Sequence, residues 1–181
     1  MTEHINLEQQ REERLIKKYE EELMEKHLQW RTLEQLRECK PCYDPVKYLP
    51  EGWKGTVIDI LNIENCPAED RIWMVTRKGL FYTDRELRLF ACECAERALS
   101  RIENPDPRSV EAIRVARLYA NGEATKDELA AAYAAAAAAY AVAYAAAADA
   151  AAAAAAYTAV ADAERKWQIE RLKEIAKEGV E

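Results

Sequence analysis

The sequence predicts an all-α protein, in which a small helical body precedes one very long C-terminal alanine-rich helix. In residues 124–163, 26 of 40 residues are alanine. Alanine has the highest helix propensity, and the run exceeds the roughly 12–15 residues below which isolated helices are marginal. Before it, helix-start signals precede apolar residues spaced three and four apart. We therefore expect a charged N-terminal helix over 1–38, a helical body over 39–123, and the long helix with a charged tail over 124–181.

The first segment predicts a charged helix over residues 8–38 with a narrow apolar seam. The apolar residues recur at heptad spacing: Ile16, Leu23 and Trp30, with Tyr19 and Leu33 three residues after two of them. Lys26 interrupts this seam. We expect a solvated helix that packs one edge on the body rather than a long coiled coil.

Prolines and glycines divide residues 40–66 into short elements. Asp44 before Pro45 predicts an N-cap with proline in the first turn. Thr56 and Asp59 predict a capping box for a helix over VIDILNI, although the same run also fits a strand. Pro67 opens PAEDRIWMVTRKGLF, whose acidic first turn and basic later residues match a helix dipole.

Two further helices are predicted before the alanine tract. Thr83 and Glu86 form a capping box for DRELRLFACECAERALSRI. Its expected inward face comprises Leu87, Phe90, Cys94, Ala98 and Ile102. Asp106-Pro107 opens PRSVEAIRVARLYA, and Asn121-Gly122 closes it. Its expected apolar positions are Val110, Ile113, Ala116 and Leu118.

The alanine helix starts at a third capping box, Thr125 and Glu128. Because no proline or glycine follows before Gly179, we expect one continuous helix from about residue 125 to 176, roughly 75 Å long. Leu129, Tyr133, Tyr140 and Tyr144 fall within about 60° of one another on it. Tyrosine is enriched at interfaces, so these four residues are the predicted partner-binding stripe. The stripe faces a partner, a dimer mate or the chain's own core, and we expect a two-fold homodimer through this helix.

The charge pattern argues against nucleic acid as a partner, because the net charge is −7 and no basic stripe occurs. Residues 129–148 carry no charge and are long enough to span a membrane. Alanine is too weakly apolar to drive insertion, so we expect no membrane association. The polar N-terminus predicts a cytoplasmic protein with reduced cysteines.

We predict no catalytic residues, no cofactor and no metal. Cys39 and Cys42 have zinc-ligand spacing, but Cys92 and Cys94 point about 200° apart on a helix and do not supply a second pair. We expect free thiols, with Cys92 or Cys94 buried. The only histidines, His4 and His27, lie in the charged N-terminal segment.

Arginines concentrate on the two helices before the alanine tract. In one interpretation, four of them line a pocket for a small anion such as a nucleotide: Arg85, Arg88, Arg114 and Arg117. In the other, they form solvated faces, because glutamates are interleaved with them.

Several segments, in order and spacing, resemble a known family over about residues 40–165. They are CYDPVKYLPEGWKGTVIDIL, PAEDRIWMV, DRELRLFACECAERAL, NPDPRSVEAIRVARLYANGEATKDELAAA and the alanine tract. The family comprises alanine-rich proteins of bacteria, prophages and phages that are usually named hypothetical or immunity proteins. Its activity is not established, so the resemblance implies no catalytic residues. It implies an all-helical fold and a role in bacterial or phage conflict.

Together these observations favour a non-enzymatic protein-binding module: an immunity or anti-defence inhibitor that occupies the surface of a toxin or defence component. An acidic inhibitor is steered toward basic surfaces. The alternative is a protein that binds or sequesters an anionic nucleotide, and an enzyme ranks third.

Overall fold

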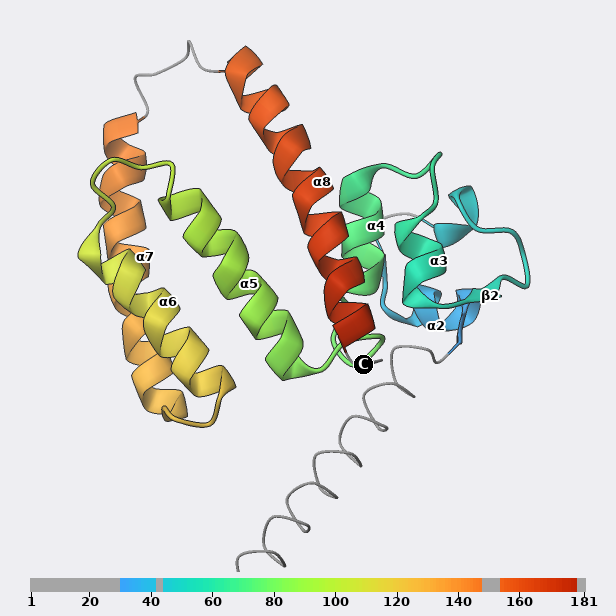
Figure 1. Ribbon diagram of the computed structural model, residues 1–181, viewed down its shortest axis with the longest axis horizontal. Coiled ribbons are helices and arrows are strands. Elements are labelled where there is room, and N and C mark those ends of the chain that lie inside the picture. The colour runs from blue at the N-terminus through green and yellow to red at the C-terminus, as the bar shows by residue number, and fades with distance from the viewer. Residues whose placement is uncertain (1–29, 42–43, 148–153, 179–181) are drawn as a thin grey trace, which may run out of the picture. The chain divides into compact units, whose positions relative to one another are not determined.

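We describe the protein from a computed structural model over residues 30–41, 44–147 and 154–178, with side chains over the same ranges except 138–147 and 154–159. The described chain is mainly helical, with one small sheet (Figure 1). It divides into two compact units. Unit 1 combines the chain up to Tyr82 with the chain from Ile169 onward, and unit 2 is Thr83–Gln168.

The first element of the described part of unit 1 is a strand, where the sequence predicted helix. β1 (Arg31–Thr32) pairs antiparallel with β2 (Lys54–Gly55), so the all-α prediction is correct only as mainly α. Thr32 then caps α2 (Leu33–Glu38) in a capping box with Gln35. The predicted helix over 8–38 is therefore wrong at its C-terminal end, because a new helix starts after the strand. Residues 8–29 lie outside the described residues.

The short elements that follow start at the predicted caps. Asp44 caps the 3-10 helix η1 (Pro45–Lys47), and its side chain accepts from the backbone N–H of Val46. Thr56 and Asp59 form the predicted capping box of α3 (Val57–Leu61), so this run is helix and not strand. After Pro67, α4 (Ala68–Val75) is shorter than predicted, with Thr76 as its C-cap.

Large apolar side chains fill the core of unit 1. Those with almost no exposure include Leu33, Leu36, Val57, Ile60, Leu61, Met74, Val75, Phe81, Tyr82 and Leu172. The hydroxyl of Tyr82 donates to the backbone carbonyl of Leu172 across 2.9 Å. Leu172 lies on α8 (Ala154–Glu178), whose last turns belong to unit 1.

Unit 2 comprises α5 (Asp84–Leu99), α6 (Pro107–Ala120), α7 (Lys126–Ala147) and the part of α8 up to Gln168. The predicted starts of the first three are confirmed: two are capping boxes and one is Asp106 before Pro107. Gly122 after α6 has a φ of 78°, a left-handed conformation that glycine adopts without steric cost.

The prediction of one continuous helix from residue 125 to 176 is wrong. The hydroxyl of Tyr133 on α7 accepts from Arg88, whereas the ring of Trp167 on α8 stacks with Phe90. A straight helix would separate Tyr133 from Trp167 by about 50 Å, yet their contacts on α5 are only two residues apart. The chain therefore reverses between Tyr133 and Trp167. Alanine favours helix at every position, but it does not oppose a reversal that packs α7 on α6 and brings side chains of α8 to α5. Residues 148–153 lie outside the described residues.

The predicted inward faces of α5 and α6 are only partly correct. Phe90 and Ala116 are buried as expected, but Ala98, Ile102 and Val110 are exposed. Ile102 lies beyond the last residue of α5, where helical spacing no longer sets its direction. On α6, the buried residues are Ala112, Val115 and Ala116.

Candidate functional site

The helices α5, α6 and α7 meet around a small buried cluster. Its members are Cys92, Val115, Ala116 and Leu129, with Ile113, Tyr119, Ala124 and Ala132 packed against it. Leu129 is only 7% exposed. The structure therefore places Leu129 in the core of unit 2 and not on a partner-binding surface. Leu129 lies in the first turns of α7, just after the capping box, and its side chain packs against α5 and α6.

A groove with a volume of about 400 Å³ lies between the same three helices, and we call it the alanine groove. Its lining consists mostly of small apolar residues: Ala91, Ala95 and Ala98 of α5, Ala112 and Ala116 of α6, and Ala136 of α7, with Cys92, Leu99 and Ile113. Because alanine carries a single methyl group, the helices leave space beside one another that larger side chains would fill. The groove thus suits an apolar guest.

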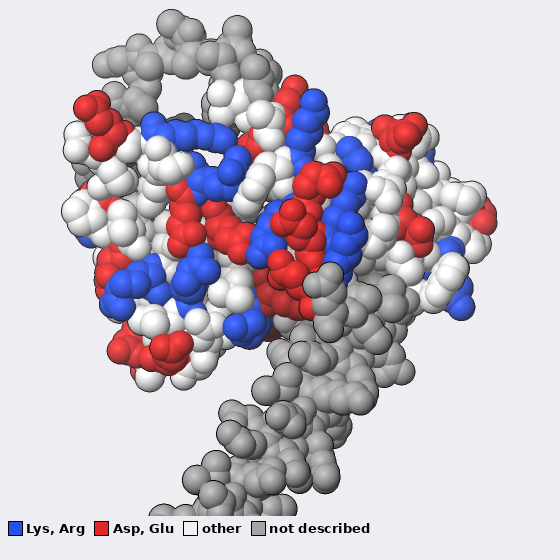
Figure 2. All heavy atoms as spheres, in the orientation of Figure 1, with Lys and Arg blue, Asp and Glu red and all other residues white. Residues whose placement is uncertain are grey.

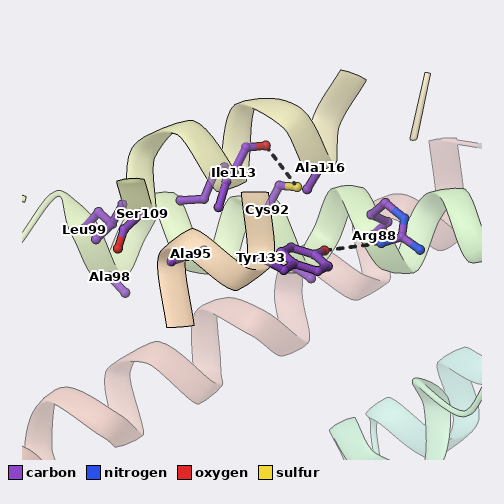
Figure 3. A pocket seen from close by; sticks show the side chains of 12 residues that line it. Arg88, Cys92, Ala95, Ala98, Leu99, Ser109, Ile113, Ala116 and Tyr133 are labelled. Carbon is purple, nitrogen blue, oxygen red and sulfur yellow. Dashed lines mark hydrogen bonds between the residues drawn. The ribbon is translucent and has the colours of Figure 1, made fainter. Parts of the chain in front are cut away.

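Polar side chains mark the two ends of the alanine groove (Figure 3). At one end, Nη1 of Arg88 lies 3.3 Å from the hydroxyl of Tyr133, and the guanidinium carbon lies 4.8 Å from the centroid of the Tyr119 ring. At the other end lies Ser109. Tyr133 is 47% exposed, so its ring is available at the edge of the groove.

Cys92 lines the alanine groove without being a reactive group. Its Sγ lies 3.8 Å from the backbone carbonyl of Ile113, and burial raises the pKa of the thiol above its ordinary value. It therefore stays protonated at neutral pH, and the thiolate is the nucleophilic form. The prediction that Cys92 or Cys94 is buried is confirmed for Cys92.

A second hollow, about 480 Å³ in volume, lies where α5 turns into α6. Ile102 and Val110 line it and are 51% and 47% exposed. Charged residues at its edge are held in ion pairs: Arg117 with Glu96 at 2.8 Å, and Arg114 with Glu111 at 2.7 Å. We call the hollow and this paired edge the α5–α6 face.

The four arginines of the predicted anion pocket do not form one open cluster. Arg114 donates from Nε and Nη2 to Glu111, and Arg117 donates from Nη2 to both carboxylate oxygens of Glu96. These hydrogen bonds raise the pKa of both guanidinium groups. Arg85 donates to the side-chain oxygen of Asn121 across 3.0 Å. Over α5 and α6, basic and acidic side chains intermingle rather than gather by sign (Figure 2). Arg88 alone lines the alanine groove.

The side chains of Tyr140 and Tyr144 lie outside the described residues. Of the three tyrosines in the predicted stripe, Tyr133 is the one whose side chain is described, and it lines the alanine groove.

The cysteines of the described chain are free, and Cys42 lies outside that part of the sequence. Cys66 is buried, and burial raises the pKa of its thiol to about 12. Within the described ranges, no three His, Cys, Asp or Glu residues are grouped so that they could hold a metal ion. The described helices also include none with the length and apolar character needed to cross a membrane.

Sequence reasoning missed the alanine groove and the α5–α6 face. A signal for the groove was present: Ala91, Ala95 and Ala98 recur every three or four residues on α5, and Ala112 and Ala116 do so on α6. Facing stripes of small residues indicate helices that approach closely. No comparable signal marked Ile102 and Val110, whose spacing is that of a buried face.

Comparisons of this chain with protein-family models, curated proteins and solved structures found no match.

Proposed function

We propose that this protein is a non-enzymatic protein-binding module of the cytoplasm that acts as an immunity or anti-defence inhibitor in bacterial or phage conflict. The role in conflict rests on the resemblance to the alanine-rich immunity-protein family. The binding surface that we assign is the α5–α6 face. The partner is a toxin or defence component with a basic surface and a protruding apolar side chain.

The observation that carries this proposal is the exposure of Ile102 and Val110 beside a hollow. Protein interfaces combine an apolar centre with a polar rim, and the ion pairs Arg117–Glu96 and Arg114–Glu111 supply such a rim here. Because these arginines are already neutralised, the rim presents no net positive charge to repel a basic partner. The net charge of −7 adds long-range attraction.

We also propose that the protein forms a homodimer through the alanine-rich helices. Ala130, Ala131, Ala134 and Ala135 on α7 are exposed, and small residues let two helices approach closely. Light scattering at tens of micromolar protein should give the mass of two chains, and a monomeric mass would contradict this part of the proposal.

The binding proposal is tested by co-expression with the products of neighbouring genes, followed by purification and measurement of binding. The double variant Ile102→Asp with Val110→Asp should weaken binding at least about 30-fold, because it places charges in an apolar interface centre. Its melting temperature should stay close to that of the parent, since both side chains are exposed. High salt should slow association.

The matched control is Val160→Asp. Val160 is 47% exposed, as Val110 is, but it does not line the α5–α6 face. This variant should bind like the parent. Equal binding by the double variant and the parent, or equal loss in the control, would reject the α5–α6 face as the docking surface.

A further inference from the structure

Arg88 differs from most arginines of unit 2 in its partners. Six others lie in ion pairs with carboxylates: Arg97, Arg101, Arg108, Arg114, Arg117 and Arg165. The described residues offer Arg88 no ion pair; its contacts are the Tyr133 hydroxyl and the Tyr119 ring, both neutral. Arg88 is also the one charged residue among those that the structure shows lining the alanine groove. The charge of a complementary guest is therefore negative.

Tyr133 and Tyr119 hold the guanidinium of Arg88 at the end of the groove, but they engage few of its N–H donors. A guanidinium carries five N–H donors in a planar fork, and one of them reaches the Tyr133 hydroxyl. The Tyr119 ring supports the group from one side. Such a fork matches the two oxygens of a carboxylate. The Tyr133 hydroxyl lies close enough to donate to the same anion.

The remainder of the groove is long and apolar. Arg88, Cys92, Ala95 and Leu99 follow one face of α5 and span about 16 Å. Arg88 lies at one end of this path and Leu99 at the other, and Tyr133 lies beside Cys92 with its hydroxyl toward Arg88 (Figure 3). A nucleobase would need donors and acceptors along this path, yet the lining between its ends is alanine, cysteine and isoleucine. An alkyl chain needs none.

We propose that the alanine groove binds a medium-chain alkyl carboxylate, with the carboxylate on Arg88 and Tyr133 and the alkyl chain along Ala95 toward Leu99. This ligand site goes beyond the docking role of the α5–α6 face. The two surfaces share Leu99 and Ile113, but ligand binding requires no protein partner.

Calorimetric titration of the full chain with octanoate, decanoate and dodecanoate, each below its micelle concentration, tests the proposal. One ligand should bind per chain, and affinity should rise by up to about 15-fold for each two added methylenes until the groove is full. Decylammonium and decanol should bind at least about tenfold more weakly than decanoate, since neither forms the charged hydrogen bonds with Arg88.

Two variants locate the site. Arg88→Met removes the charge and keeps an apolar stem, and it should weaken decanoate binding about tenfold or more. Ala95→Leu fills the middle of the groove and should abolish binding of decanoate. Their controls are Arg108→Met and Ala163→Leu, which change exposed residues outside the groove and should bind decanoate like the parent. Circular dichroism establishes that each variant is folded.

Several outcomes would overturn the proposal. They are no decanoate binding up to millimolar concentration, unchanged binding in folded Arg88→Met or Ala95→Leu protein, equal affinity for decylammonium, and uptake of many decanoate molecules per chain. None of them bears on the α5–α6 face, which is tested with a protein partner.

Discussion

The two units bury very different side chains. The ten apolar side chains named above for unit 1 are all at most 1% exposed, and they include Phe81, Tyr82 and Met74. In the described part of unit 2, buried apolar residues keep between 4% and 8% of their surface, and several are as small as alanine and cysteine. Unit 1 has a closed core of large side chains. In unit 2, α5, α6 and α7 meet around a cluster that includes alanine and cysteine side chains beside Val115 and Leu129.

This difference separates the part of the chain with the larger buried side chains from the part that carries the surfaces to which we assign binding. Large buried side chains supply most of the free energy of folding, because that energy grows with the apolar area removed from water. Small residues remove less area, but they bring helices close and leave apolar space between and beside them. Both surfaces to which we assign binding, the alanine groove and the α5–α6 face, lie in unit 2.

The largest effect should come from removing a large side chain in unit 1. Phe81→Ala should lower the free energy of unfolding by about 3–5 kcal/mol, because the ring is 0% exposed and its removal leaves a cavity. Urea unfolding followed by circular dichroism measures this loss. A loss below about 1 kcal/mol would mean that the closed core of unit 1 is not the main source of stability.

A smaller effect should follow Leu129→Ala in unit 2. We expect a loss of about 2–3 kcal/mol, near the lower end for a buried leucine, since the cluster around it borders the exposed first turns of α7 and can close part of the cavity. Tyr133→Ala, four residues along the same helix, should change stability by less than about 0.5 kcal/mol, because Tyr133 is half-exposed. Urea unfolding of both variants separates a core position from a surface position. Equal losses would contradict that assignment.

The smallest effect concerns acid stability. Hydrogen bonds from the side chain and backbone of Arg108 lower the pKa of Asp106 to about 2. A carboxyl group whose pKa is lower in the folded chain stabilises above its ordinary pKa of about 4, and that contribution is lost as the pH falls toward 2. Asp106→Asn should therefore flatten the acid side of the stability profile, measured by urea midpoints between pH 6 and pH 2.

The comparable group in unit 1 is Asp44, whose pKa is lowered by hydrogen bonds from Arg37 and the backbone of Val46. Asp44→Asn should flatten the profile in the same direction. An unchanged profile in both variants would show that these exposed ion pairs contribute nothing measurable to either unit.

The residues at which the helices begin could be predicted from the sequence, but the helices against which each one packs could not. Thr56, Thr83 and Thr125 each cap a helix through a side chain that contacts residues within one turn, so local sequence suffices. Chain reversal within the alanine tract depends on contacts of α7 and α8 with α5, which local propensity does not encode. The same limit explains Leu129, which has the spacing of the tyrosine stripe but is buried by helices from elsewhere in the sequence.

For the candidate site, sequence indicated the residue types but not their partners. The arginine-rich helices were recognised, yet only contacts across helices distinguish Arg88 from Arg114 and Arg117. The strand at Arg31–Thr32 was also missed, because its pairing with Lys54–Gly55 joins segments more than twenty residues apart. The pair Thr32 and Gln35 has the pattern of a capping box, and it would have predicted a new helix start there.

The division of α8 between the units bears on the order of events during synthesis. Tyr82 is made about 90 residues before Leu172, whose backbone carbonyl accepts the hydrogen bond that the Tyr82 hydroxyl donates. A domain whose segments all lie early in the chain can fold while the rest of the chain is still being synthesised. Here neither unit has all its segments until α8 has emerged from the ribosome. Until then, the core of unit 1 is incomplete and its large apolar side chains stay partly exposed to solvent. The nascent chain is therefore expected to need protection from aggregation until α8 has left the ribosome.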